Sequence, residues 1–99
     1  MTLESKFQAE LISELHDIYP EGIILKNDAN YLQGFPDITI LLDHFWAVLE
    51  TKRYSKSSRQ PNQQYYIEKL DEMSFAAFIS RENRDEVLHD LQQAFRSRR

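Results

Sequence analysis

The sequence contains no cysteine, only two glycines and only three prolines. The lack of cysteine excludes a disulfide-stabilised fold, a cysteine-ligated zinc or iron–sulfur site, and a cysteine nucleophile. No apolar run approaches the roughly 18 residues needed to cross a membrane, and the N-terminal segment lacks the apolar core of a signal peptide. The three histidines have no metal-ligand spacing, and no glycine-rich nucleotide-binding motif is present. We therefore expect an intracellular protein that does not bind a membrane.

What remains is the composition of one folded domain. The 99 residues are 41% hydrophobic and 28% charged, which is typical of a folded protein. No linker or repeat divides them, so we expect a single domain, 1–99. Residues 1–50 carry two bases and nine acids, whereas residues 51–99 carry ten bases and seven acids. Residues 52–59 hold four bases and no acid, and the chain ends Arg-Ser-Arg-Arg. These basic segments either contact phosphates or form a solvated loop and tail.

Hydrophobic periodicity predicts an α/β fold in which helices flank a small mixed β-sheet. Apolar residues at helical spacing run from Leu3 to Ile18, and Pro61 favours the start of a second helix. Two apolar segments flank Asp43-His44 and predict a β-hairpin. The expected elements, in the order αβββαβα, are a helix at 3–18, strands at 23–25, 37–42 and 45–50, a helix at 61–73, a strand at 75–79, and a last helix capped by Asn83 and Glu86.

The predicted hairpin brings charged residues together at its open end. If Leu42 pairs with Phe45, paired residue numbers sum to 87 and Asp37 lies opposite Glu50. Side chains alternate along a strand, so Glu50 and Lys52 point to the same face. Two facing carboxylates are destabilising on their own, and a divalent cation between them reverses that effect. The cluster is therefore either a metal site or a sheet edge at which Lys52 neutralises one acid.

Several short motifs together resemble the PD-(D/E)xK nuclease superfamily. One strand is opened by Gly34-Phe-Pro-Asp37, and the next is closed by Glu50-Thr-Lys52. The first helix carries Glu4 with Phe7, Leu11 and Ile12, and the second begins with Pro61-Asn-Gln63, which is similar to the VRR-NUC branch. The likeness extends from about Glu4 to Ile79. The sequence most resembles small stand-alone VRR-NUC proteins of phages and prophages, and it is more distantly similar to archaeal Holliday junction resolvases.

The resemblance implies a restriction-endonuclease-like core and a set of roles. Asp37 and Glu50, with the main-chain carbonyl of Thr51, would ligate Mg²⁺ or Mn²⁺, and Lys52 would be the catalytic lysine. Glu4 would supply an additional acid and metal ligand, whereas Glu10 and Glu14 are less apt. Gln63 would contact the site, or else be an ordinary polar residue at a helix start. Branched DNA such as a Holliday junction would be the substrate, in the host cytoplasm if a phage encodes the chain.

The basic loop supplies the expected DNA contacts, and other interpretations stay open. Contacts are expected from Lys52, Arg53, Tyr54, Lys56 and Arg59. A homodimer is expected because a junction needs two opposed nicks, with Phe45, Trp46, Tyr65 and Phe95 as interface candidates. The alternatives are a catalytically silent DNA-binding module on the same fold, a monomeric nickase of flaps or single strands, and a protein–protein adaptor with an exposed apolar patch. The residues Asn27, Asp28 and Gln33 have no assigned role.

Overall fold

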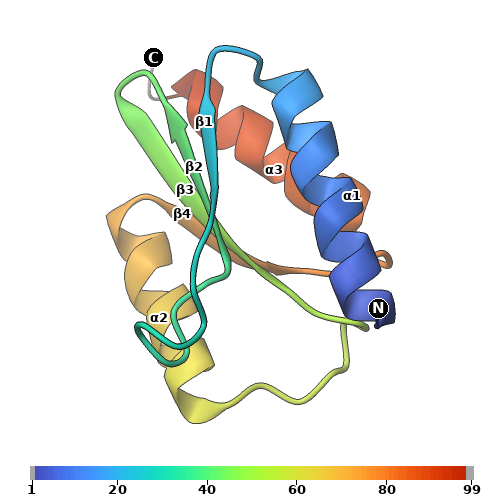
Figure 1. Cartoon of the computed structure of the whole chain (residues 1–99). Helices are drawn as coiled ribbons and strands as arrows, with labels where there is room; N and C mark the ends of the chain where they lie inside the picture. Colours follow the sequence, from blue (N-terminus) through green and yellow to red (C-terminus); the bar gives the residue numbers. More distant parts are fainter. Residues whose placement is uncertain (1, 98–99) are drawn as a thin grey trace.

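The chain folds as a four-stranded mixed sheet with helices on both faces (Figure 1). The computed structural model describes residues 2–97, so Arg98 and Arg99 of the basic C-terminus lie outside the described residues. The predicted fold class and the order αβββαβα are confirmed. The elements are α1 (Leu3–Ile18), β1 (Ile23–Lys26), β2 (Ile38–Leu42), β3 (Phe45–Thr51), α2 (Pro61–Met73), β4 (Phe75–Ile79) and α3 (Arg84–Ser97).

The strands follow the order β1-β2-β3-β4, so β2 and β3 are the inner strands. The pairings of β1 with β2 and of β2 with β3 are antiparallel, whereas β4 runs parallel to β3. Leu42 pairs with Phe45 and Ile38 pairs with Leu49, which confirms the predicted hairpin register. Asp43 takes the left-handed conformation that a tight turn needs, with φ of 56°. The register fixes which residues meet at the open end of the hairpin.

Alternation along β3 divides the interior into two cores. Side chains at odd positions, such as Ala47 and Leu49, pack against α1 and α3. Val48, at an even position, packs against Ile67 of α2 and against β4. Continuing this alternation places Glu50 on the α2 side of the sheet and Thr51 on the α1 side. The side chains of these two adjacent residues therefore point toward different helices.

Of the four aromatic residues expected at an interface, Phe45 lies in the core instead, and Phe95 is partly buried against it. Phe45 is 6% exposed, and its ring centroid lies 5.8 Å from that of Phe95. Phe95 also packs edge-on against Tyr19, with centroids 6.1 Å apart. These rings close the end of the core beside the hairpin turn. Trp46 packs beside the α2 core, so Tyr65, which is 58% exposed, is the member of the predicted set that remains at the surface.

The side chain of Asn83 has a different role from the predicted cap. It precedes α3, and its main-chain carbonyl accepts the amide of Val87 at 2.9 Å. Its side-chain oxygen accepts the amide of Ser80 at 2.7 Å, and its nitrogen donates to the carbonyl of Phe78 at 3.2 Å. Asn83 thus ties the end of β4 to the start of α3. Within residues 2–97, no helix combines the length and the apolar character needed to cross a bilayer.

Candidate active site at the open end of the hairpin

Asp37 lies at the open end of the hairpin, one residue before β2. Continuing the β2–β3 register by one pair places it opposite Glu50. The loop that leads to it is fixed by Asn27, whose side-chain nitrogen donates to Pro36 O and to Thr39 Oγ1, each at 2.8 Å. The amide of Asn27 also donates to the Asp37 carbonyl at 2.8 Å. The role of Asn27, unassigned from sequence, is therefore to hold the segment that presents Asp37.

The carboxylate of Asp37 is bound by donors from α1 and β3. Gln8 Nε2 donates to Oδ2 at 2.9 Å, and Thr51 Oγ1 donates to the same oxygen at 2.6 Å. The Thr51 amide donates to Oδ1 at 3.1 Å. Sequence reasoning missed Gln8, although a signal was available. It lies one helical turn after Glu4, on the helix face that points toward the hairpin.

Gln63 joins Glu50 to Lys52 on the α2 side of the sheet. Its side-chain oxygen accepts Lys52 Nζ at 2.7 Å and the amide of Gln60 at 3.0 Å. Because the oxygen faces these two donors, the amide nitrogen faces Glu50 and donates to Oε2 at 3.4 Å. Lys52 Nζ also donates to the carbonyl of Ser58 at 3.1 Å. The first turn of α2 thus holds the lysine and the glutamate at fixed positions.

Burial makes the two carboxylates costly to ionise. Glu50 is 7% exposed, and burial, followed by the charge of Asp37, raises its pKa to about 8. Burial also raises the pKa of Asp37, against the opposing effect of its hydrogen bonds from Thr51 and Gln8. Within residues 2–97, no lysine or arginine forms an ion pair with either carboxylate. Ionising both carboxyl groups in the folded chain is therefore unfavourable, and the charge of Lys52, which acts to lower the pKa of Glu50, offsets this effect only in part.

Glu4 lies near this pair at the start of α1. Its charge contributes to the raised pKa values of both Asp37 and Glu50. Among the described residues, however, no group of three or more histidine, aspartate or glutamate side chains is arranged to hold a metal. Glu4 therefore adds negative potential at the site, and its role as a ligand stays a prediction.

The other two acids near this face of α1 pair with arginines beyond β4. Glu10 forms an ion pair with Arg81 at 2.9 Å. Glu14 pairs with Arg84, whose Nε donates to it at 2.9 Å. These pairs attach α1 to the start of α3. They agree with the expectation that Glu10 and Glu14 are less apt than Glu4 for a role in the site.

The basic loop, residues 52–59, runs beside the site, and several contacts with the rest of the chain hold it in place. The Arg59 guanidinium lies 4.0 Å from the centre of the Phe78 ring, and that of Arg53 lies 5.2 Å from the centre of the Tyr54 ring. Tyr54 and Lys56 are exposed. The loop is anchored at Ser55, whose amide donates to Glu82 at 2.7 Å. Arg59 and Lys52 thus both lie over the Phe78 ring, and the exposed Lys56 lies further along the same loop.

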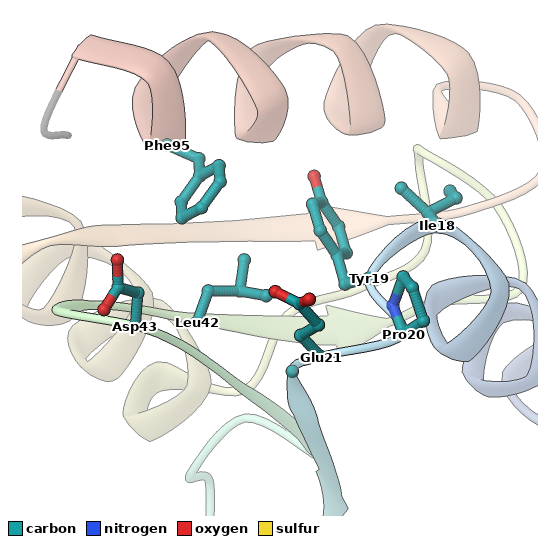
Figure 2. Close-up of a pocket in the computed structure, with 8 residues that line it drawn as sticks. Ile18, Tyr19, Pro20, Glu21, Leu42, Asp43 and Phe95 are labelled. Carbon is teal, nitrogen blue, oxygen red and sulfur yellow. The ribbon is translucent and has the colours of Figure 1, made fainter.

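A separate hollow of about 490 Å³ lies at the opposite end of β2, beside the hairpin turn (Figure 2). Two acids, Glu21 and Asp43, line it, and they would repel a phosphate backbone. The remaining lining residues are Ile18, Tyr19, Pro20, Gly22, Leu42 and Phe95. This hollow does not offer the chemistry found around Asp37.

The donors around Asp37 and Glu50 fit a hard divalent cation. Mg²⁺ and Mn²⁺ prefer oxygen ligands, commonly one or two carboxylates completed by carbonyls and water. Asp37 and Glu50 supply two carboxyl groups, and a cation would favour their ionised forms against the burial and the neighbouring negative charges that raise their pKa values. The arrangement can therefore concentrate positive charge beside an amine, which is suited to an anionic substrate.

Comparison with solved structures identifies the fold. The chain is similar to a solved structure described as a VRR_NUC domain, with a TM-score of 0.69 and 20% sequence identity over 90% of this chain and 97% of that chain. The chain thus has the VRR-NUC-like nuclease fold that its motifs resembled. No family model matches the sequence, and no curated protein matches it. At this identity the similarity shows the fold, and the chemistry depends on the residues described above.

Proposed function

We propose that the chain is an intracellular, metal-dependent endonuclease that hydrolyses DNA phosphodiester bonds. One observation carries the proposal. The carboxyl groups of buried Glu50 and partly buried Asp37 lie at the open end of the hairpin with raised pKa values, and Gln63 joins Glu50 to Lys52. The VRR-NUC-like fold supports the same conclusion, because this arrangement lies on a nuclease-type scaffold.

The roles of the residues follow from their positions. Asp37, Glu50 and the main-chain carbonyl of Thr51 hold Mg²⁺ or Mn²⁺, with Glu4 contributing negative potential or a further ligand. When bound, the cation stabilises developing charge on the phosphate and lowers the pKa of a water nucleophile. Lys52 donates from its ammonium group to the nucleophile or to a phosphate oxygen. Gln63 keeps that ammonium group in place, and its bond to Lys52 at 2.7 Å supports this role.

The proposed DNA contacts come from the basic loop. Lys56 and Tyr54 are exposed, and Arg53 and Arg59 place further positive charge near Lys52. Contacts from these cations to phosphates would be independent of sequence and would weaken with salt. Recognition of DNA structure, rather than of base sequence, is consistent with such a surface.

We propose branched DNA as the substrate and a homodimer as the active form. One site makes one nick, whereas two-fold symmetry supplies a second site for the opposed strand. The structure offers a surface for this contact. On the α2 face, the helix packs on β3 and β4, while Ile23, Leu25 and Leu41 of β1 and β2 are exposed. β1 is also an edge strand, so two copies can pair antiparallel across a two-fold axis.

A cleavage panel tests the proposed function. Purified protein is incubated with labelled four-way junction, flap, duplex and single-stranded DNA in Mg²⁺, in Mn²⁺ or in EDTA. We expect cleavage of the junction with either metal and none in EDTA. Preferred cutting of flaps or single strands would support the monomeric nickase. Binding to DNA without cleavage in any metal would support the silent module and overturn the enzyme.

A further inference from the structure

The two oxygens of Asp37 have unequal hydrogen bonding. Oδ2 accepts Gln8 Nε2 at 2.9 Å and Thr51 Oγ1 at 2.6 Å, and it lies 3.4 Å from the Thr51 amide. Among residues 2–97, Oδ1 accepts only the Thr51 amide, at 3.1 Å. A carboxylate oxygen has two lone-pair directions. The donors of Gln8 and Thr51 therefore fill Oδ2, whereas Oδ1 keeps capacity for one more partner.

The donors to Oδ2 also contact each other. Gln8 Nε2 lies 3.4 Å from Thr51 Oγ1, which accepts from it while donating to Asp37. The three side chains come from α1, from β3 and from the residue before β2. The closed triangle restricts rotation of the Asp37 carboxylate, because turning it would break bonds to two separate elements.

We propose that Gln8 and the Thr51 hydroxyl are positioning residues that occupy one oxygen of Asp37 and present the other, Oδ1, to the divalent cation. This role rests on the proposed function, because it concerns the same metal site. Hydrogen bonds to a ligating carboxylate fix its orientation, and their loss commonly weakens metal binding about 10-fold to 100-fold.

The neutrality of both donors supports this assignment. An arginine or lysine at position 8 would also orient Asp37, but it would neutralise the charge that attracts a cation. An amide and a hydroxyl orient the carboxylate and leave its negative charge in place. Thr51 is fully buried, so its hydroxyl has no competing bond to bulk water. Its main chain and its side chain thus act on the same site.

The test measures Mn²⁺ affinity directly, by titration with detection of free Mn²⁺ by electron paramagnetic resonance. Gln8→Leu and Thr51→Val remove the donors without changing the charge, Thr51→Ser keeps the hydroxyl, and Gln93→Leu changes an exposed glutamine of α3 as the control. We expect Gln8→Leu and Thr51→Val to bind about 10-fold to 100-fold more weakly than wild type. We expect Thr51→Ser and Gln93→Leu to bind as wild type does.

Each outcome bears on a separate claim. Circular dichroism verifies that each variant is folded, and the Thr51 pair carries the test alone if Gln8→Leu unfolds. Wild-type affinity in folded Thr51→Val, or an equal loss in Thr51→Ser, would overturn the positioning role while leaving the metal site intact. A wild-type chain that binds no Mn²⁺ would overturn both the proposed function and this role.

Discussion

The carboxyl groups of Glu50, which is buried, and of Asp37, which is partly buried, lie at the open end of the hairpin. Burial and mutual repulsion raise the pKa of Glu50 to about 8, from an ordinary value of 4.5. The folded chain therefore holds a proton that the unfolded chain releases between these two pH values. Stability from this group is complete below pH 4.5 and is lost as the pH rises through about 8.

This difference in pKa predicts that Glu50→Gln, measured in EDTA, increases the free energy of unfolding by an amount that depends on pH. At pH 9 the variant should be more stable than wild type by a few kcal/mol, on the order given by about 1.4 kcal/mol per pKa unit. At pH 5 the two should be similar, because the glutamate is then protonated in the folded chain. Urea unfolding at both pH values measures the effect, and Glu72→Gln, at an exposed site on α2, is the control. A difference that is the same at both pH values would contradict the account.

Among the elements, α1 has a structural function and a function at the site, and a different acidic residue serves each of them. Glu10 pairs at 2.9 Å with Arg81, in the turn between β4 and α3, whereas the charge of Glu4 acts on Asp37 and Glu50. We expect Glu4→Gln to lower the rate of metal-dependent cleavage at least about 10-fold. Changes to residues around a metal site typically cost about 10-fold to 100-fold, and this is the lower limit of that range. Glu10→Gln should leave the rate nearly unchanged. Single-turnover rates compare the two variants, and equal rates would assign α1 a purely structural role.

The loop between β3 and α2 is the second element with a testable function. We expect Lys56→Gln to weaken binding to every DNA form and to reduce the slope of log affinity against log salt by about 0.9, the value for one phosphate contact. Lys69→Gln, an exposed lysine on α2, is the matched control. Fluorescence anisotropy across a salt series measures both slopes. If the two variants have the wild-type slope, Lys56 belongs to a solvated loop.

Local patterns in the sequence predicted most of the elements and part of the site. The apolar stripe of α1 and the alternation in β2 and β3 are short-range signals, so the hairpin register followed from them. Continued by one pair, that register sets Asp37 opposite Glu50. The bond from Gln8 to Asp37 spans 29 positions, and the packing of Phe45 on Phe95 joins β3 to α3. Such contacts depend on how the helices dock on the sheet, which periodicity does not specify.

At the scale of the whole molecule, the sheet is unevenly covered. Ile23, Leu25 and Leu41 are 56%, 43% and 39% exposed on the half of the sheet that α2 leaves open. We expect the wild-type chain to be a dimer at micromolar concentration and Leu25→Lys to shift it toward the monomer, because the lysine would place charge in the contact. Met73→Lys, at another exposed apolar site, should leave the dimer intact. Light scattering measures the mass, and a monomeric wild type that cuts junctions would contradict the dimer.

The central claim is that Lys52, beside a cation held by Asp37 and Glu50, takes part in cutting DNA. The most direct measurement compares wild type with Lys52→Met for single-turnover cleavage of a labelled junction in Mg²⁺, with DNA affinity measured on the same samples. We expect cleavage by Lys52→Met to fall about 10²-fold to 10³-fold, the cost of losing one charge-stabilising donor, while affinity changes far less. Cleavage by Lys52→Met at the wild-type rate, or wild-type cleavage that persists in EDTA, would contradict the central claim.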